Sequence, residues 1–150
     1  MPLRLFNTLS GKIEEFHPIE SNQVRMYACG PTVYDYGHIG NFRTFIAVDI
    51  LRRFLHQSGY KVRHVMNITD VDDKIIRNSA EAGVPVQEFT AKYEKSFLED
   101  AAILNIEQPE LVRATEHIPE MADFIARLAE KGFCRDGRRR PRGCGRIRKR

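Results

Sequence analysis

The stretch Cys29-Gly-Pro-Thr-Val-Tyr-Asp-Tyr-Gly-His-Ile-Gly-Asn-Phe-Arg43 decides how this 150-residue chain folds. It follows an apolar run, Val24–Ala28, that is typical of a buried strand, and it leads into a helical pattern that continues to about Ser58. Between strand and helix lie the turn-forming residues Gly30, Pro31, Asp35, Gly37 and Gly40. A strand, a glycine-rich turn and a helix N-terminus together form an anion site, because free backbone N–H groups and the helix dipole point at the ligand. The stretch therefore predicts half of a nucleotide site.

Arg43–Gln57 is predicted to be a helix that lies between two strands. Its polar residues share one narrow face, and nearly every other position is apolar, which is typical of a crossover helix packed on a sheet. Ser58-Gly59 ends the helix, and Tyr60–Met66 is the predicted second strand. Strand, helix and strand within about 45 residues form a βαβ unit, so we expect parallel strands and a right-handed crossover. The polar residues of the helix are Asp49, Arg52, Arg53 and His56.

Two polar loops are expected to meet at one end of this sheet. Ligands of parallel sheets bind beyond the carboxyl ends of the strands. The loop Cys29–Asn41 leaves the first strand at that end, and Asn67–Lys74 leaves the second. The sequence therefore predicts that both loops face the same crevice, although a whole helix separates them along the chain.

Within the first loop, His38 and Asn41 lie three positions apart on either side of Gly40. Near a phosphate, they would offer two nitrogen donors to negative charge that grows in a transition state. The alternative interpretation is an ordinary helix cap with a surface histidine.

The second loop, Asn67–Lys74, carries three Asp residues among four positions. These residues could bind a cation or hold the backbone. The alternative is a solvated turn in which Asp72 or Asp73 caps the next helix.

The rest of the pattern predicts a small number of further elements. Two short runs separated by Ser10-Gly11 read as a hairpin, and three segments have helical apolar periodicity that is interpreted as ordinary core packing. The hairpin strands are Leu3–Leu9 and Lys12–Phe16, and the helices are Asp73–Ala82, Val86–Leu104 and Ile118–Glu130.

The positive charge of the chain is confined to its last residues. Of 24 Lys and Arg residues, 9 lie in 134–150 with a single Asp, a net charge of +8. The other 15 lie in 1–133 with 19 Asp and Glu residues, a net charge of −4. Residues 1–133 therefore read as one domain without a nucleic-acid signature. Residues 134–150 lack apolar periodicity and are expected to be a basic, disordered tail, which either binds nucleic-acid phosphates non-specifically or has no role.

The cysteines Cys29, Cys134 and Cys144 form no Cys-x-x-Cys pair. No leader pattern is visible, and no apolar run approaches the roughly 20 residues that span a bilayer, so a reducing cytoplasm without membrane contact is expected. Cys29 is a soft metal ligand at the end of a strand, but the nearby sequence supplies no partners at ligand spacing. A small buried side chain is the alternative interpretation.

Four separated motifs occur together and in a fixed order. In combination they resemble the N-terminal part of cysteinyl-tRNA synthetases, which are class I aminoacyl-tRNA synthetases with a Rossmann catalytic domain. The resemblance runs from about Leu3 to Phe133. The motifs are Met26–Asp35, Gly37–Thr44, Asn67–Lys74 and Arg113–Ile118.

This resemblance implies an α/β fold, namely the first half of a Rossmann-like parallel sheet with crossover helices, an N-terminal hairpin and a helical insertion. It also implies a monomeric cysteine–tRNA ligase. Such an enzyme activates cysteine with ATP and magnesium to a cysteinyl-adenylate and transfers the amino acid to tRNA(Cys).

The resemblance also assigns the nucleotide-binding residues. His38 and Asn41 match the family's His-Ile-Gly-His signature, with an asparagine in the last position that still offers an N–H donor. They are implied to be the catalytic pair that holds the ATP phosphates, with Gly37 and Gly40 beside them.

For the amino acid, the resemblance points to the start of the same stretch. Cys29 matches a ligand of the zinc ion that binds the substrate thiolate. Zinc prefers sulfur to a hydroxyl, so the metal separates cysteine from serine. Gly30, Thr32 and Thr69 are implied to line the cysteine pocket.

The sequence also departs from the family. The remaining zinc ligands and the Lys-Met-Ser-Lys-Ser loop are absent from these 150 residues. The abrupt change of composition after Phe133 indicates a reading-frame shift or a mispredicted gene end, so the product is expected to be truncated and inactive alone. Two other functions remain open: a related ligase that joins cysteine to an amino sugar in mycothiol synthesis, and a non-catalytic nucleic-acid-binding fragment.

Overall fold

The computed structural model describes residues 3–133, so the predicted tail at 134–150 lies outside the described residues. The chain divides into two compact units, Met1–Glu116 and His117–Arg150.

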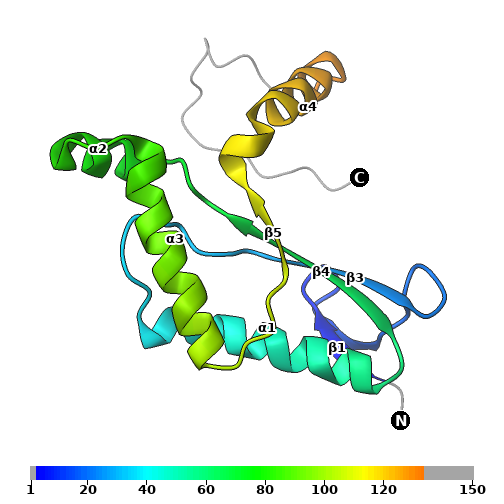
Figure 1. Ribbon diagram of the computed structural model, residues 1–150. Helices are drawn as coiled ribbons and strands as arrows, with labels where there is room; N and C mark the ends of the chain where they lie inside the picture. Colours follow the sequence, from blue (N-terminus) through cyan, green and yellow to red (C-terminus); the bar gives the residue numbers. More distant parts are fainter. Residues whose placement is uncertain (1–2, 134–150) are drawn as a thin grey trace. The chain divides into compact units, whose positions relative to one another are not determined.

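The first unit is built on a three-stranded parallel sheet (Figure 1). Its strands lie in the order β3 (Gln23–Ala28), β4 (Lys61–Ile68) and β5 (Glu110–Arg113). The helix α1 (Ile39–Gln57) joins β3 to β4, which confirms the predicted βαβ unit. Helices α2 (Asp73–Ala82) and α3 (Val86–Ile103) then join β4 to β5. This is an α/β fold of the Rossmann-like kind.

The strand β5 was not predicted from the sequence. It has four residues, only two of them apolar, and it follows directly after Pro109. Its register pairs Met66 of β4 with Leu111 and Ile68 with Arg113. The neighbouring strand, rather than any alternation of its own, makes this segment extended.

The predicted N-terminal hairpin is confirmed. β1 (Arg4–Asn7) and β2 (Lys12–Glu15) pair antiparallel, with Arg4 opposite Glu15. After β2, the ring of Phe16 lies edge-on to Tyr60 with 6.2 Å between the ring centroids.

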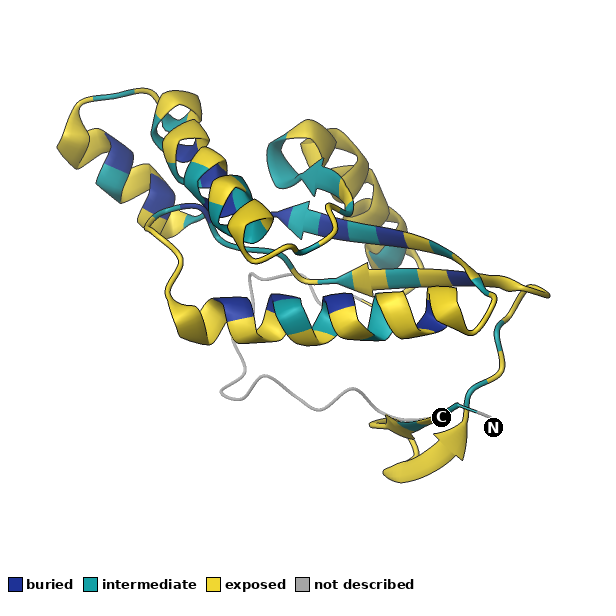
Figure 2. Cartoon of the chain, turned by 60° about the horizontal axis from the view of Figure 1, so that its bottom comes forward, coloured by how far each residue is buried: buried dark blue, intermediate teal, exposed yellow. Residues whose placement is uncertain are grey.

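The core lies on one face of the sheet. Successive strands step in one direction, so two right-handed crossovers place α1 and α3 on the same face. Figure 2 shows the buried positions of these helices and of β4. The ring of Phe97 in α3 stacks on Phe42 at 5.7 Å and meets Phe45 at 5.0 Å. These rings pack with Met66 and Ile68 of β4, which are 2% and 0% exposed. Each fully buried side chain of this size contributes about 1.5–3 kcal/mol.

Helix α1 is covered less completely than its apolar sequence predicts, since Ile50 and Phe54 are 61% and 47% exposed. Conversely, Asp49 from its polar stripe is only 8% exposed. The reason is that the polar stripe contacts the segment that connects α3 to β5.

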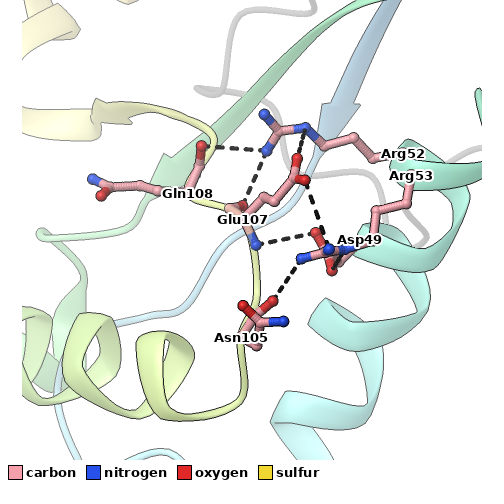
Figure 3. Close-up of polar contacts among 6 residues, drawn as sticks. All are labelled: Asp49, Arg52, Arg53, Asn105, Glu107 and Gln108. Carbon is pink, nitrogen blue, oxygen red and sulfur yellow. Dashed lines mark hydrogen bonds and ion pairs between the residues drawn. The ribbon is translucent and has the colours of Figure 1, made fainter. Parts of the chain in front are cut away.

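Figure 3 shows this polar cluster. Arg52 donates to the carbonyl oxygens of Glu107 and Gln108 at 3.0 and 3.2 Å. The carboxylate of Asp49 accepts from Nε of Arg53 at 2.7 Å and from the backbone N–H of Glu107 at 3.1 Å. The cluster fastens the C-terminal half of α1 to the chain that enters β5.

A buried histidine, His64, lies on β4 and is 6% exposed. Neither of its ring nitrogens has a hydrogen-bond partner. Burial lowers the pKa of His64, the nearby Arg52 guanidinium lowers it further, and Asp49 partly opposes this. The imidazole is therefore held in its neutral form.

The described part of the second unit is the helix α4 (Ile118–Glu130), as predicted. Its apolar stripe differs from the expectation of core packing, because Met121, Phe124 and Ile125 are 44–60% exposed. Among residues 3–133, no helix combines the length and the apolar character needed to cross a membrane.

Candidate functional site

The two polar loops meet at the carboxyl end of the sheet, as predicted. The backbone N–H of Thr69 donates to the carbonyl oxygen of Pro31 at 3.0 Å, and Val33 N–H donates to the carbonyl oxygen of Thr69 at 3.1 Å. These bonds form a parallel bridge between Thr32 and Thr69, one residue beyond the end of β4. The loop after β3 is thus fixed to the loop after β4.

A side-chain amide reinforces this junction. Oδ1 of Asn67 accepts from the backbone N–H of Gly30 at 3.1 Å and from the hydroxyl of Tyr27 at 2.9 Å. Its Nδ2 donates to the hydroxyl of Thr69 at 3.0 Å. Sequence analysis placed Asn67 in the second loop but gave it no role. An amide that can accept and donate at a strand end was the signal that could have identified it.

Gly30 is needed at this junction for steric reasons. A Cβ atom at this position would lie 1.8 Å from the carbonyl oxygen of Asn67 and 2.8 Å from Cγ of Met66. Only glycine allows the two backbones to approach this closely.

A cavity of about 400 Å³ opens beside the junction. Its size lies within the range of small-molecule sites. Two aromatic residues of α3, Tyr93 and Phe97, form the opposite wall. Of the predicted site residues, six line it: Cys29, Gly30, Thr32, Gly37, His38 and Asn41. Gly40 and Thr69 are not among its lining residues, but Thr69 is bridged to Thr32, which is.

His38 and Asn41 form the N-terminal cap of α1. Nδ1 of His38 accepts from the backbone N–H of Gly40 at 3.1 Å, and Oδ1 of Asn41 accepts from the backbone N–H of His38 at 3.1 Å. The capping interpretation therefore describes the hydrogen bonds correctly. These bonds do not use all the N–H groups of the two side chains. Because Nδ1 is an acceptor, the proton of the neutral ring sits on Nε2, and Asn41 keeps both protons of Nδ2. The cap thus leaves two nitrogen donor groups, Nε2 of His38 and Nδ2 of Asn41, on residues that line the cavity.

Lysine side chains border the same loop. Nζ of Lys92 lies 5.4 and 5.2 Å from the ring centroids of Tyr36 and Tyr93, and Nζ of Lys74 lies 4.9 Å from that of Tyr34. A hydrogen bond to Tyr36 raises the pKa of Lys92, so this ammonium group stays charged. These cations favour an anionic ligand.

The acidic loop does not present a cation site. Asp72 caps α2 by accepting from the backbone N–H of Ile75 at 2.8 Å, as the capping alternative predicts. The carboxylate of Asp70 accepts from Thr115.

Cys29 lines the cavity with an exposed side chain. Within 3–133, no group of three or more His, Cys, Asp or Glu side chains gathers around a point that could hold a metal ion. The described residues alone therefore do not fit a complete zinc site.

Comparison with known proteins identifies relatives over most of the chain. Residues 15–139 match the family model described as the tRNA synthetases class I (C) catalytic domain. A cysteine–tRNA ligase of Koribacter versatilis is 74% identical over 131 residues, which cover 87% of this chain and 26% of that protein. A cysteine–tRNA ligase of Solibacter usitatus is 54% identical over 131 residues, covering 87% and 28%. The chain thus spans about a quarter of the length of the curated relatives it matches.

Among solved structures, a Mycobacterium tuberculosis methionyl-tRNA synthetase in complex with methionyl-adenylate is similar in fold. The TM-score is 0.64 at 24% sequence identity, and the match covers 73% of this chain and 22% of that one.

Proposed function

Because this chain belongs to the class I tRNA synthetase (C) catalytic domain family, we propose that it forms the N-terminal part of a cysteine–tRNA ligase. In this reaction a carboxylate oxygen of cysteine attacks the α-phosphorus of ATP and pyrophosphate leaves. A ribose hydroxyl of tRNA(Cys) then attacks the carbonyl carbon of the adenylate and AMP leaves. The names of the relatives support this function over the ligase of mycothiol synthesis and over a non-catalytic nucleic-acid-binding fragment.

The observation that carries the proposal is the junction of the two loops around one cavity. At one end of the first loop, Nε2–H of His38 and the Nδ2 protons of Asn41 are the donors for the ATP phosphates. They are held by the capping box, so little reorganisation is needed when charge grows on the α-phosphate. Gly37 and Gly40 have no side chains, so the backbone beside these donors can approach a phosphate closely.

At the other end, Cys29, Gly30 and Thr32 form the wall for the amino acid, and Thr69 supports it from behind through the bridge to Thr32. Cys29 is the one candidate zinc ligand among the described residues. When bound, zinc would supply a Lewis acid that selects a thiolate.

We further propose that the 150 residues have no cysteine-dependent ATP–pyrophosphate exchange on their own. Residues 3–133 offer donors for the phosphates but one candidate zinc ligand, and the 150-residue sequence contains no Lys-Met-Ser-Lys-Ser stretch. We expect this chain to bind ATP weakly without catalysing the exchange. We place the protein in the cytoplasm, because a reducing compartment keeps an exposed thiol such as that of Cys29 reduced. We also propose that it is a monomer.

A chimera tests the proposed function. Residues 1–133 of this chain replace the matching stretch of the K. versatilis ligase, and exchange is measured with cysteine and with serine. Exchange that depends on cysteine and is absent with serine is the expected result. A soluble, folded chimera without cysteine-dependent exchange would contradict the proposal.

A further inference from the structure

A buried carboxylate outside the candidate site ties the second loop to the chain that follows β5. Asp70 is 6% exposed. Its Oδ1 accepts from the backbone N–H of Thr115 at 3.0 Å, and its Oδ2 accepts from the hydroxyl of the same residue. Both oxygens are satisfied by one residue that lies 45 positions further along the chain.

The sheet explains why these two residues meet. The parallel register pairs Ile68, the last residue of β4, with Arg113, the last residue of β5. Asp70 and Thr115 each lie two residues beyond these strand ends. The link therefore continues the β4–β5 pairing past the strands, on the side of the sheet end away from β3.

We propose that Asp70, held by Thr115, is a positioning residue for amino-acid binding in the ligase. The inference rests on the proposed function. Asp70 follows Thr69 directly, and the backbone of Thr69 holds Pro31 and Val33 by two hydrogen bonds. Thr32 lies between these two residues and lines the cavity. Hydrogen bonds and neighbouring residues thus connect Thr115, through Asp70 and Thr69, to the stretch Pro31–Val33 in the wall proposed to bind the amino acid.

The chemistry of the link favours positioning over simple stabilisation. A buried carboxylate must recover a large desolvation cost, and well-packed apolar residues are often as stable in its place. What an ionised acceptor adds is direction, because a carboxylate with two hydrogen bonds has a fixed orientation. The link lies beyond the strand ends, outside the apolar core of Phe42, Phe45 and Phe97.

A second polar link holds the opposite wall in the same way. Glu94 of α3 is 8% exposed and forms a two-point ion pair with Arg113, whose Nε lies 3.0 Å from Oε2 of the carboxylate. The neighbouring residue on α3 is Tyr93, which lines the cavity. Both walls are therefore anchored to the same short segment, Arg113–Thr115.

The position of the link predicts a selective effect. His38 and Asn41 are fixed by their own capping box and share no bond with Asp70. Loosening the link should therefore impair binding of the amino acid more than binding of ATP or the chemical step.

Thr115→Val is the test variant, since it removes the hydroxyl and keeps the size and the backbone N–H. Thr90→Val is the matched control. Thr90 and Thr115 both line a second cavity of about 670 Å³, which Asp70 also borders. Thr90 is buried, and its hydroxyl bonds only to carbonyl oxygens of its own helix, those of Val86 and Gln87. Thr115→Ser keeps the hydroxyl and should restore the parent values.

In the chimeric ligase, Thr115→Val should raise KM for cysteine about tenfold, the factor expected for one hydrogen bond to a charged group. KM for ATP and kcat should change less than threefold, a factor roughly within the background of unrelated surface changes. In the 150-residue chain, the same variant should speed hydrogen exchange of the Val33 and Thr69 amides, while Thr90→Val should not.

Equal effects of Thr115→Val and Thr90→Val, or equal changes in both KM values and kcat, would overturn the inference. If Thr115→Val does not fold, Asp70→Asn is judged by the same criteria, because it keeps the shape and one acceptor. A folded parent chimera without exchange would overturn the proposed function and this inference together. An active parent with an unselective Thr115→Val variant would overturn the inference alone.

Discussion

Replacing Gly30 by alanine should break the junction of the two loops. The added Cβ would lie 1.8 Å from the carbonyl oxygen of Asn67, whereas real Cβ atoms essentially never approach another heavy atom within 3.0 Å. The carbonyl group would have to move by about 1.2 Å, the difference between these distances. Since it belongs to the backbone of β4, no side-chain rotation can relieve the overlap.

The cost can be worked out from this geometry. Overpacking of a tight interior costs about 1–3 kcal/mol, and a rigid backbone neighbour places Gly30→Ala at the upper end. Loss of the bond from Gly30 N–H to Asn67 adds about 1 kcal/mol. The reduced entropy of the unfolded chain returns roughly 0.4–1 kcal/mol. The net loss of unfolding free energy is about 3 kcal/mol.

Urea unfolding of the 150-residue chain, followed by circular dichroism, measures this loss. Gly11→Ala is the control, because Gly11 has φ +71° and nothing within 4 Å of a built Cβ. That change carries only the conformational penalty of the left-handed region, about 1–2 kcal/mol. If Gly30→Ala proved no more destabilising than Gly11→Ala, the close approach of the two loops would be refuted.

Three other perturbations test the rest of the description. His64→Leu should flatten the pH dependence of stability. Burial lowers the pKa of His64, so the parent protein loses stability as the pH falls from about 6.5, the pKa of an unfolded histidine, toward the lower pKa of the folded state. Urea midpoints measured across this pH window test the difference between the two proteins. Asp49→Ala should cost about 1.5–3 kcal/mol in urea unfolding, because it removes a buried, charged acceptor that bonds the backbone N–H of Glu107, whereas Glu99→Ala, which breaks an exposed pair with Lys95, should cost less than about 0.5 kcal/mol. Asn41→Ala in the chimera should lower kcat for cysteine-dependent exchange about a hundredfold by removing a donor; an unchanged kcat would contradict its phosphate role.

The sequence was sufficient to predict the βαβ unit and the meeting of the two loops. Apolar runs, a helix with one polar stripe and the rule for parallel sheets determine both without knowledge of any side-chain contact. The resemblance to cysteinyl-tRNA synthetases agreed with the family match.

What could not be predicted depends on distant partners. Glu110–Arg113 becomes a strand only beside β4, and Asp49 is buried only because the segment before β5 crosses it. The apolar stripe of α4 shows the same limit in another way. Its periodicity correctly predicts a helix, but it does not predict that the stripe is exposed.

The candidate site shows a further limit of spacing arguments. Helix cap and phosphate donor were treated as alternatives for His38 and Asn41. The capping box uses one nitrogen of the imidazole and the oxygen of the amide, and it leaves the other donors free. The two roles are therefore compatible at the same residues.

The most direct test of the central claim separates these two roles of His38. In the chimeric ligase, His38→Ser keeps a good N-cap but lacks a donor that reaches into the cavity. Cysteine-dependent ATP–pyrophosphate exchange should then fall in kcat by about 100- to 1,000-fold, the cost of removing one transition-state donor, while the melting temperature stays at the parent value. A folded His38→Ser enzyme that exchanges pyrophosphate at the parent rate would contradict the account.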